Sequence, residues 1–272
     1  MIKYNFKLLV KKLLGQDFKP VVYPQKVDEL FELEIVFLIT PGRSGTQTLV
    51  EYCIANSTLL SLHAPEVTLG AINHLYDQQR ISSEAAKWCY YTSREKYLLQ
   101  AFTEKKVFLD GDCKSLSILP LLAKEFPKSK FIHLVRKPAS FIKSGLSRGY
   151  FTSKPSAFWG YLEDNDKTNL SQIEKIALFW NKANIIAEKM KKELPSNRIQ
   201  TLIAEEMFQD GSEITKTFEL LHLLNHFNAI NNNNKLNVKN GQRKKINIDT
   251  VLMEEIFEAV DLICTTKDIY YK

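Results

Sequence analysis

A short glycine-containing loop near residue 40 carries residue types that suit the binding of an anion. It lies in EIVFLITPGRSGTQTLVEYC (34–53), where one apolar run ends and another begins. If the second run is a helix, its first N–H groups lack intrahelical partners and its dipole is positive at that end. A glycine turn of this kind also occurs in α/β proteins that bind nothing there, so the loop alone leaves both interpretations open. The residues that we expect to bind the anion are Arg43, Ser44, Gly45, Thr46, Gln47 and Thr48.

The loop is not the one that ATP- and GTP-binding proteins use. Their loop reads GxxxxGK[ST], with the lysine on the β- and γ-phosphates and the hydroxyl on magnesium. Counted from Gly42, the chain has Gln47 and Thr48 where that motif needs glycine and lysine. The anion that this loop binds is therefore not expected to be a triphosphate.

A second pair of polar residues follows another apolar run. Arg136 comes directly after KFIHLV (130–135), and Ser144 lies eight residues further on. Ligands of open α/β sheets bind beyond the carboxyl ends of the strands, so this arginine is expected to reach into such a crevice. An arginine paired with a surface carboxylate is the alternative interpretation.

The elements that would position these residues alternate along the chain. Alternating strands and helices are typical of a parallel sheet with helices on both faces, so we predict a three-layer α/β/α fold with a mostly parallel sheet. Apolar runs rich in β-branched or aromatic residues predict strands at 34–40, 58–62, 106–110, 130–135 and 198–203. Apolar spacing predicts helices at 45–56, 82–104, 115–126, 138–149, 171–193, 212–227 and 249–264. Ser115 and Pro138 are the expected start signals of the third and fourth of these helices.

Length and composition favour one globular domain over residues 1–272. Residues 1–33 are expected to form an accessory helix and lead-in, and the asparagine-rich stretch 228–240 a flexible loop. The net charge of +6 mildly favours an anionic ligand, and without a dense basic stripe a nucleic-acid partner is not expected. The scattered cysteines predict reduced thiols in a cytoplasmic protein rather than a metal site. The lysines of residues 1–15 leave weak contact with a membrane surface open.

Both anion-binding segments resemble motifs of the sulfotransferases that use 3′-phosphoadenosine 5′-phosphosulfate (PAPS). TPGRSGTQTL is similar to the 5′-phosphosulfate loop of that family, and FIHLVRKPASFIKS to its 3′-phosphate motif. The resemblance implies the P-loop sulfotransferase fold, with residues 43–48 on the 5′-phosphosulfate and Arg136 and Ser144 on the 3′-phosphate. It extends more weakly to ALFWNKAN (177–184) and to RIQTLIAEEM (198–207). It implies PAPS as co-substrate, 3′,5′-ADP as product and no bound metal.

Transfer of the sulfuryl group would need a cation at the leaving phosphate and a base for the proton of the acceptor hydroxyl. Arg43 is the candidate cation. The family often has His-Glu-Pro after the second strand, whereas this chain has His63, Ala64, Pro65 and Glu66. His63 titrates near neutral pH, and burial could raise Glu66 into the same range, so both are candidate bases. The resemblance also implies that Lys114, or a neighbour, approaches the acceptor oxygen or the sulfuryl group; a surface lysine is the alternative.

The acceptor is expected to be a carbohydrate hydroxyl, a phenol or another small alcohol, with a peptide tyrosine less favoured. The aromatic stretch 149–166 is a candidate wall or lid of the acceptor pocket. Two other functions stay open. A P-loop kinase or NTPase would use Asp110, at the end of KVFLD, as its magnesium-binding carboxylate. A non-catalytic nucleotide-binding module of the same fold would explain the alanine at position 64.

Overall fold

The computed structural model describes residues 24–25, 28–152, 169–209, 211–228 and 250–271. Its centre is a five-stranded sheet with the strand order β2-β3-β1-β4-β5, in which every pairing is parallel. The predicted α/β fold with a parallel central sheet is therefore confirmed. The predicted accessory helix at 1–15 and nearly all of the loop at 228–240 lie outside the described residues.

The five strands lie where the apolar runs predicted them, within two residues at either end. Helices precede, connect and follow these strands along the chain. The strands are β1 (Ile35–Ile39), β2 (Leu60–His63), β3 (Phe108–Gly111), β4 (Lys130–Val135) and β5 (Ile199–Ile203). The helices are α2 (Asp28–Phe31), α3 (Thr46–Asn56), α4 (Gly70–Asp77), α5 (Ser83–Glu104), α6 (Leu119–Glu125), α7 (Pro138–Ser147), α8 (Gln172–Glu193), α9 (Ala204–Met207), α10 (Ser212–Leu220), α11 (Thr250–Ile263) and α12 (Lys267–Tyr270), with 3₁₀ turns η1 (Leu116–Ile118) and η4 (Leu224–His226).

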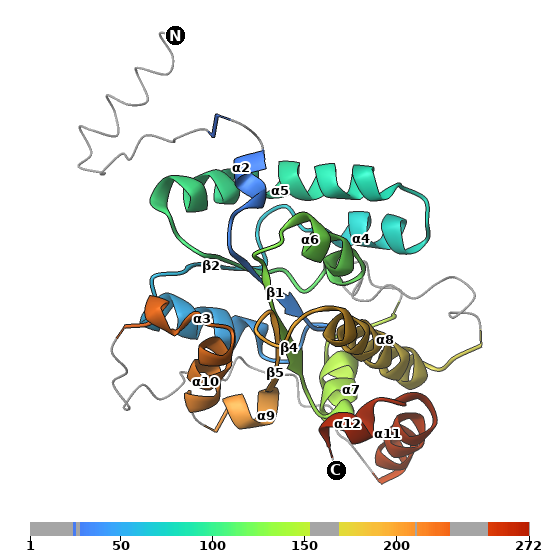
Figure 1. Cartoon of the computed structure of the whole chain (residues 1–272). Coiled ribbons are helices and arrows are strands. Elements are labelled where there is room, and N and C mark those ends of the chain that lie inside the picture. The colour runs from blue at the N-terminus through green and yellow to red at the C-terminus, as the bar shows by residue number, and fades with distance from the viewer. Residues whose placement is uncertain (1–23, 26–27, 153–168, 210, 229–249, 272) are drawn as a thin grey trace, which may run out of the picture.

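Side chains of β1 divide between two apolar cores, one on each face of the sheet. Ile35, Phe37 and Ile39 pack with residues of α5, α6, α7, α8 and α11, whereas Val36 and Leu38 pack with residues of α3, α9 and α10. Figure 1 shows these two groups of helices on opposite sides of the strands. Because successive strand residues point to opposite faces, a fully apolar strand such as β1 requires cover on both sides.

Three predicted helices end or break differently from the sequence prediction. The helix predicted at 115–126 is divided into η1 and α6, because Pro120 near the start of α6 has no N–H to continue a helix. Ser115 does not cap it, since its hydroxyl donates to the Asp112 carbonyl instead, at 3.0 Å. The helix predicted at 212–227 ends at Leu220, where His222 takes a left-handed φ of 61°. The helix predicted at 138–149 ends at Ser147, two residues before Gly149 at φ 68°.

Two helix starts confirm local sequence signals. Pro138 stands in the first turn of α7, as predicted, where a missing N–H costs nothing. Ser171 caps α8 with a full capping box: its hydroxyl accepts from Glu174 N, and the Glu174 carboxylate accepts from Ser171 N. Both helices carry residues that reach the candidate site.

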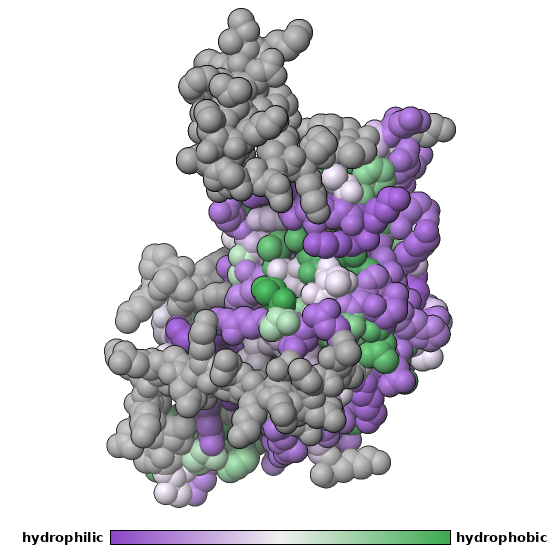
Figure 2. Space-filling view, turned by 90° about the vertical axis from the view of Figure 1, so that its left-hand side faces the viewer, coloured by the Kyte–Doolittle hydropathy of each residue, from purple (hydrophilic) through white to green (hydrophobic). Residues whose placement is uncertain are grey.

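The surface is that of helices packed by their apolar stripes. Among the coloured residues of the face in Figure 2, most are hydrophilic, and apolar side chains gather near its middle. Within the part of the chain that the structure describes, no helix combines the length and the apolar character needed to cross a membrane.

Candidate active site

The topology brings both predicted anion-binding segments to the same edge of the sheet. From β1 the chain moves outward to β2 and back through β3, and it then crosses to β4 on the other side of β1. Strand order therefore reverses between β1 and β4, which pair directly from Val36 with Lys130 to Ile39 with His133. Ligands of open α/β sheets bind at such a switch point, beyond the carboxyl ends of the strands. The loop after β1 and Arg136 after β4 both lie there.

Three residues of the loop between β1 and α3 have a positive φ. Gly42, Arg43 and Gly45 have φ of 78°, 54° and 98°. A Cβ on Gly45 would stand 2.6 Å from Cε of Met207, so only glycine fits between the loop and α9. The positive φ of Arg43 is a strained conformation for a residue with a side chain, and strain of this kind gathers at ligand sites.

Polar side chains of the loop hold its own shape. The Ser44 hydroxyl, fully buried, donates to the Gly42 carbonyl at 3.2 Å, and Gly42 N donates to the Thr40 hydroxyl at 3.3 Å. The Gln47 amide donates to Glu51 on the exposed side of α3 at 2.9 Å. No side chain caps the start of α3, so the N–H groups of its first turn stay available to an anion. Ser44 and Gln47 can therefore serve an anion through backbone N–H rather than through these side chains.

Arg43, Arg136 and Ser144 form one connected group. Arg136 Nη1 donates to the Arg43 carbonyl at 2.8 Å. Arg43 Nε donates to the Ser144 hydroxyl at 3.3 Å, across the space between the loop and α7. Two segments that are about 90 residues apart in the chain thus place two guanidinium groups and a hydroxyl together.

Helix α8 fixes the backbone at Arg136. The Trp180 indole, fully buried, donates to the Arg136 carbonyl at 2.8 Å. One turn later Asn184 donates to the Trp180 carbonyl at 2.7 Å and receives a 2.8 Å hydrogen bond from His133 Nε2 on β4. His133 and Trp180 are both buried in the core, and the indole also holds the backbone at Arg136, a role that the sequence did not reveal.

His63 lies next to the anion loop. Its Nε2 is 3.3 Å from the Thr46 hydroxyl in the first turn of α3. Partial burial of the ring lowers the pKa of His63 below its usual value; the charges of Glu51 and Asp112 oppose this shift, and Arg43 adds to it. An imidazole that is largely neutral near pH 7 can accept a proton.

The residues after His63 differ in their relation to the site. Ala64 has a φ of 48°, a second strained position beside the anion loop. Glu66 is exposed to solvent, and among the described contacts none joins its carboxylate to the loop. Both side chains are exposed, and His63 differs from Glu66 in that its ring contacts the anion loop through Thr46.

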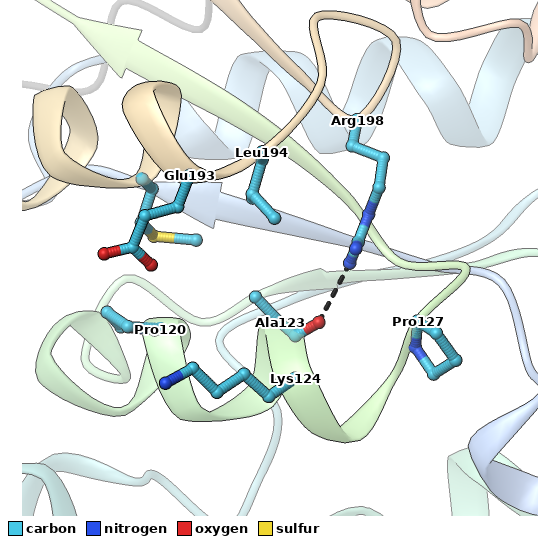
Figure 3. A pocket seen from close by; sticks show the side chains of 8 residues that line it. Pro120, Ala123, Lys124, Pro127, Glu193, Leu194 and Arg198 are labelled. Atoms are coloured by element: carbon cyan, nitrogen blue, oxygen red, sulfur yellow. Dashed lines mark hydrogen bonds between the residues drawn. The ribbon is translucent and has the colours of Figure 1, made fainter.

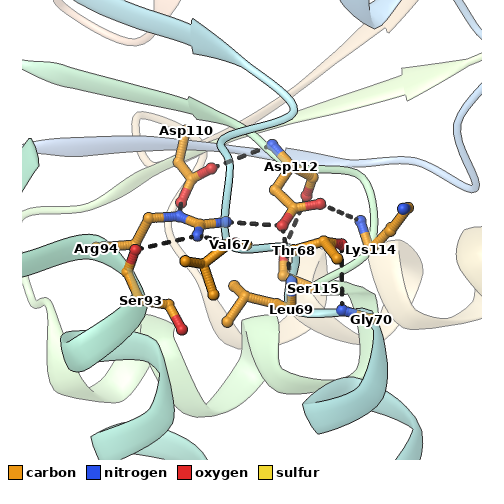
Figure 4. A network of polar contacts seen from close by, with 10 residues as sticks. All are labelled: Val67, Thr68, Leu69, Gly70, Ser93, Arg94, Asp110, Asp112, Lys114 and Ser115. Atoms are coloured by element: carbon orange, nitrogen blue, oxygen red, sulfur yellow. Dashed lines mark hydrogen bonds and ion pairs between the residues drawn. The ribbon is translucent and has the colours of Figure 1, made fainter.

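Lys114 reaches the same edge of the sheet from the loop after β3. Its neighbour Cys113 packs against the anion loop, since a Cβ on Gly42 would stand 3.2 Å from the Cys113 sulfur. Burial raises the pKa of the Cys113 thiol to about 12, which keeps it protonated. The Lys114 side chain extends away from the neighbouring carboxylates in Figure 4, while its N–H donates to Asp112 Oδ1 at 2.9 Å.

A buried arginine that sequence reasoning missed takes up the carboxylate of Asp110. Arg94 of α5 donates through Nε to Asp110 Oδ2 at 2.8 Å and through Nη2 to Asp112 Oδ2 at 2.7 Å (Figure 4). The three side chains are 0%, 3% and 3% exposed. Asp110 is therefore held by a guanidinium, which is the opposite of what a magnesium-binding carboxylate requires. The only signal for Arg94 in the sequence was its place on the apolar face of α5, four residues after Tyr90 and four before Leu98.

A second hollow lies away from this site. Figure 3 shows the side chains that line it, between α6, the end of α8 and Arg198. Its volume is about 390 Å³, and because Arg198 directly precedes β5 it lies near the amino ends of the strands. Arg198 donates to the carbonyls of Ala123 and Phe126, at 3.0 and 3.2 Å, so it closes the end of α6. This hollow contains none of the predicted site residues.

Part of the predicted acceptor wall lies outside the described residues. The structure describes residues 149–152 of the stretch 149–166, where Tyr150 is fully buried and Phe151 has a φ of 56°. The rest of that stretch stays a prediction.

Comparisons with known proteins give a distant likeness in structure. The sulfotransferase domain of the Synechococcus PCC 7002 olefin synthase matches with a TM-score of 0.46 and 18% identity, over 88% of this chain and 91% of that domain. The sulfotransferase domain from the curacin biosynthetic pathway matches with a TM-score of 0.45 and 17% identity, over 70% of this chain and 74% of that domain. Both are sulfotransferase domains, the class that the sequence motifs resemble. No family model matches the chain, and no curated protein matches it significantly.

Proposed function

We propose that this protein is a sulfotransferase that uses PAPS and transfers the sulfuryl group to a hydroxyl acceptor, of which a carbohydrate or a small alcohol or phenol is the first choice. The observation that supports this most strongly is the contact between Arg136 and the Arg43 carbonyl. It joins the two segments that resemble the 5′- and 3′-binding motifs into a single anion site. A donor with phosphate groups at both the 3′ and 5′ positions has the charge distribution that such a site suits.

The residues present fit that donor. The first turn of α3 offers backbone N–H groups with no side-chain cap, and Arg43 lies in the loop that leads into it. Arg136 and Ser144 offer a planar donor fork and a hydroxyl for a second phosphate. The donor supplies a sulfate–phosphate anhydride, whose S–O bond to the phosphate breaks as the acceptor oxygen bonds to sulfur.

Each nearby side chain then has a role that its position supports. His63 accepts the proton of the acceptor hydroxyl, because its imidazole lies beside Thr46 and has a lowered pKa. Arg43 stabilises the negative charge that develops on the leaving phosphate. Lys114 would lie on the acceptor side of the same edge. The products are a sulfate ester and 3′,5′-ADP.

The alternative of a P-loop kinase or NTPase has less support. Its lysine is missing from the loop, and its proposed metal ligand Asp110 is paired with Arg94. The non-catalytic alternative rests on Ala64 alone, and the His63 imidazole is present beside it.

Replacing Arg136 tests the assignment of the 3′-phosphate. Arg136→Ala should weaken binding of 3′,5′-ADP by about 2–5 kcal/mol, roughly 30-fold or more, because it removes a charged partner of the phosphate. It should weaken binding of 5′-AMP much less, since that ligand has no 3′-phosphate and loses only the support that Arg136 gives to the Arg43 carbonyl. Isothermal titration calorimetry measures both ligands.

The control is Arg80→Ala, which removes an exposed arginine in the turn after α4. Its affinities should match those of the wild type. Equal losses for 3′,5′-ADP and 5′-AMP in Arg136→Ala would refute the assignment.

A further inference from the structure

Arg94, Asp110 and Asp112 form a buried charge cluster, which we call the Arg94 cluster, at the carboxyl end of β3. Its two ion pairs join α5 to the last strand residues and to the loop beyond them (Figure 4). Asp112 N also donates to Asp110 Oδ1 at 3.1 Å, which fixes the bend where the strand ends. Burial raises the pKa of Asp110, and the Arg94 guanidinium opposes that shift, so the ion pair is what keeps a carboxylate away from solvent here.

The Arg94 cluster binds both loops on the acceptor side of the site. Arg94 Nη1 donates to the Val67 carbonyl at 2.6 Å, and Asp112 Oδ2 accepts from Leu69 N at 3.2 Å. Both contacts hold the loop that begins after His63. On the other side Asp112 Oδ1 accepts from Lys114 N at 2.9 Å. A single carboxylate, Asp112, therefore connects the loop after β2 with the loop that carries Lys114.

Stability alone does not account for such a cluster. Removing charges from water is costly, and buried ion pairs can often be replaced by apolar residues of similar volume without loss of stability. What an apolar replacement cannot reproduce is the set of directed contacts to Val67, Leu69 and Lys114. These contacts fix the positions of the loop after β2 and of the loop that carries Lys114.

We propose that Arg94 is a positioning residue. Through Asp110 and Asp112 it fixes the loop that follows His63 relative to Lys114, and so shapes the acceptor half of the site without touching the nucleotide half. This proposal rests on the proposed sulfotransferase function and extends it to the acceptor. The negative charge of Asp112 raises the pKa of His63, as does that of Glu51, whereas the charge of Arg43 lowers it. The Thr46 hydroxyl is the hydrogen-bond neighbour of the same ring.

Two conservative variants test the role. In Arg94→Lys one ammonium replaces three donors that serve Asp110, Asp112 and Val67, so the loops lose directed contacts while the positive charge stays. Asp112→Asn keeps the shape of the side chain and removes its charge. If one variant does not fold, the other still decides the proposal.

Hydrogen exchange followed by mass spectrometry reads the positions of the loops directly and needs no acceptor. In both variants, exchange should accelerate in residues 64–69 and 113–115 and stay unchanged in α3 and α7. The Kd for 3′,5′-ADP should stay within about twofold, while kcat/KM for an acceptor selected from a panel of sugars and phenols falls roughly 10- to 100-fold. In Asp112→Asn the pKa of His63, measured by NMR, should fall, because a negative charge near the ring is lost.

Arg198→Lys is the matched control, because Arg198 is a partly buried arginine with hydrogen bonds to Ala123, Phe126 and Ser129, outside the predicted site. It should lower stability and leave exchange at 64–69, the His63 pKa and acceptor kinetics unchanged. Equal effects from Arg198→Lys would overturn the proposal, as would unchanged exchange at 64–69 and 113–115 in the Arg94 and Asp112 variants. A wild-type protein that does not bind 3′,5′-ADP would instead overturn the proposed function, and the exchange comparison would still test the positioning role.

Discussion

At the scale of single residues, the candidate site depends on two strained positions and one histidine. Arg43 and Ala64 both have positive φ, and they lie in the loops that meet where Thr46 contacts His63. Strained backbone persists only where surrounding structure enforces it, and it gathers at ligand sites. His63 rather than Glu66 is thus the candidate base that the geometry favours.

Replacing each candidate base separates their roles. His63→Ala should lower kcat by about 10²- to 10⁴-fold, the usual contribution of a general base, and leave the affinity for 3′,5′-ADP close to that of the wild type. Glu66→Gln should leave kcat within about twofold, because its carboxylate lies at the surface. Transfer of radiolabelled sulfuryl groups from PAPS to an acceptor selected from the panel measures both.

The pH dependence of the same reaction also tests the role of His63 as the base. A general base must be deprotonated, so kcat/KM should rise with pH through the pKa of His63 and become level above it. Because that pKa is lowered, the rise should lie below pH 6.5, the ordinary value for histidine. A loss of activity in Glu66→Gln with normal activity in His63→Ala would reverse the assignment.

At the scale of elements, the pair β4 and α8 holds the second half of the anion site. Trp180 and Asn184, one turn apart on α8, connect to the Arg136 carbonyl and to His133. Burial lowers the pKa of His133 to about 3, so the ring is neutral in the folded protein. In the unfolded chain it would titrate near its ordinary value.

This difference predicts a loss of stability in acid. Between about pH 6.5 and pH 3 the unfolded chain binds one more proton at His133 than the folded protein does, so the free energy of unfolding falls as the pH falls. From pH 7 to pH 5 this histidine should contribute a loss of about 2 kcal/mol.

The variant His133→Gln isolates that contribution. Its amide can donate to Asn184 as Nε2 does, and it does not titrate. Urea denaturation at pH 5 and pH 7 should show a smaller difference in the variant than in the wild type. The same difference in both proteins would mean that His133 does not carry the effect.

At the scale of the whole molecule, the order of the strands places the loops that follow β1, β2, β3 and β4 at one edge of the sheet. The loops after β1, β2, β3 and β4 all begin at the carboxyl end of a parallel sheet, and the order reverses beside β1. Arg43, Lys114 and Arg136 lie in three of these loops, and His63 is the last residue of β2. No single segment contains enough of the site to bind a bisphosphate.

Much of this could be predicted from the sequence because the strands are continuous apolar runs and the two anion motifs have specific spacing. Arg43 and Arg136 were placed correctly at strand ends by that reasoning. The Arg94 cluster could not be predicted, since its partners lie 16 and 18 residues further along the chain on another element. Helix α4 was missed because it has only eight residues and is held in part by a tertiary contact, in which Asn73 accepts from Ser117 N at 2.6 Å.

The proposed function requires that one adenosine bisphosphate contact both Arg43 and Arg136 without a metal ion. Calorimetric titration of the wild-type protein in EDTA tests it most directly, with 3′,5′-ADP and with ATP as ligands, followed by ATP with magnesium. We predict saturable one-to-one binding of 3′,5′-ADP in EDTA and no displacement of that ligand by equimolar ATP. Binding of ATP that requires magnesium, together with no binding of 3′,5′-ADP, would contradict it.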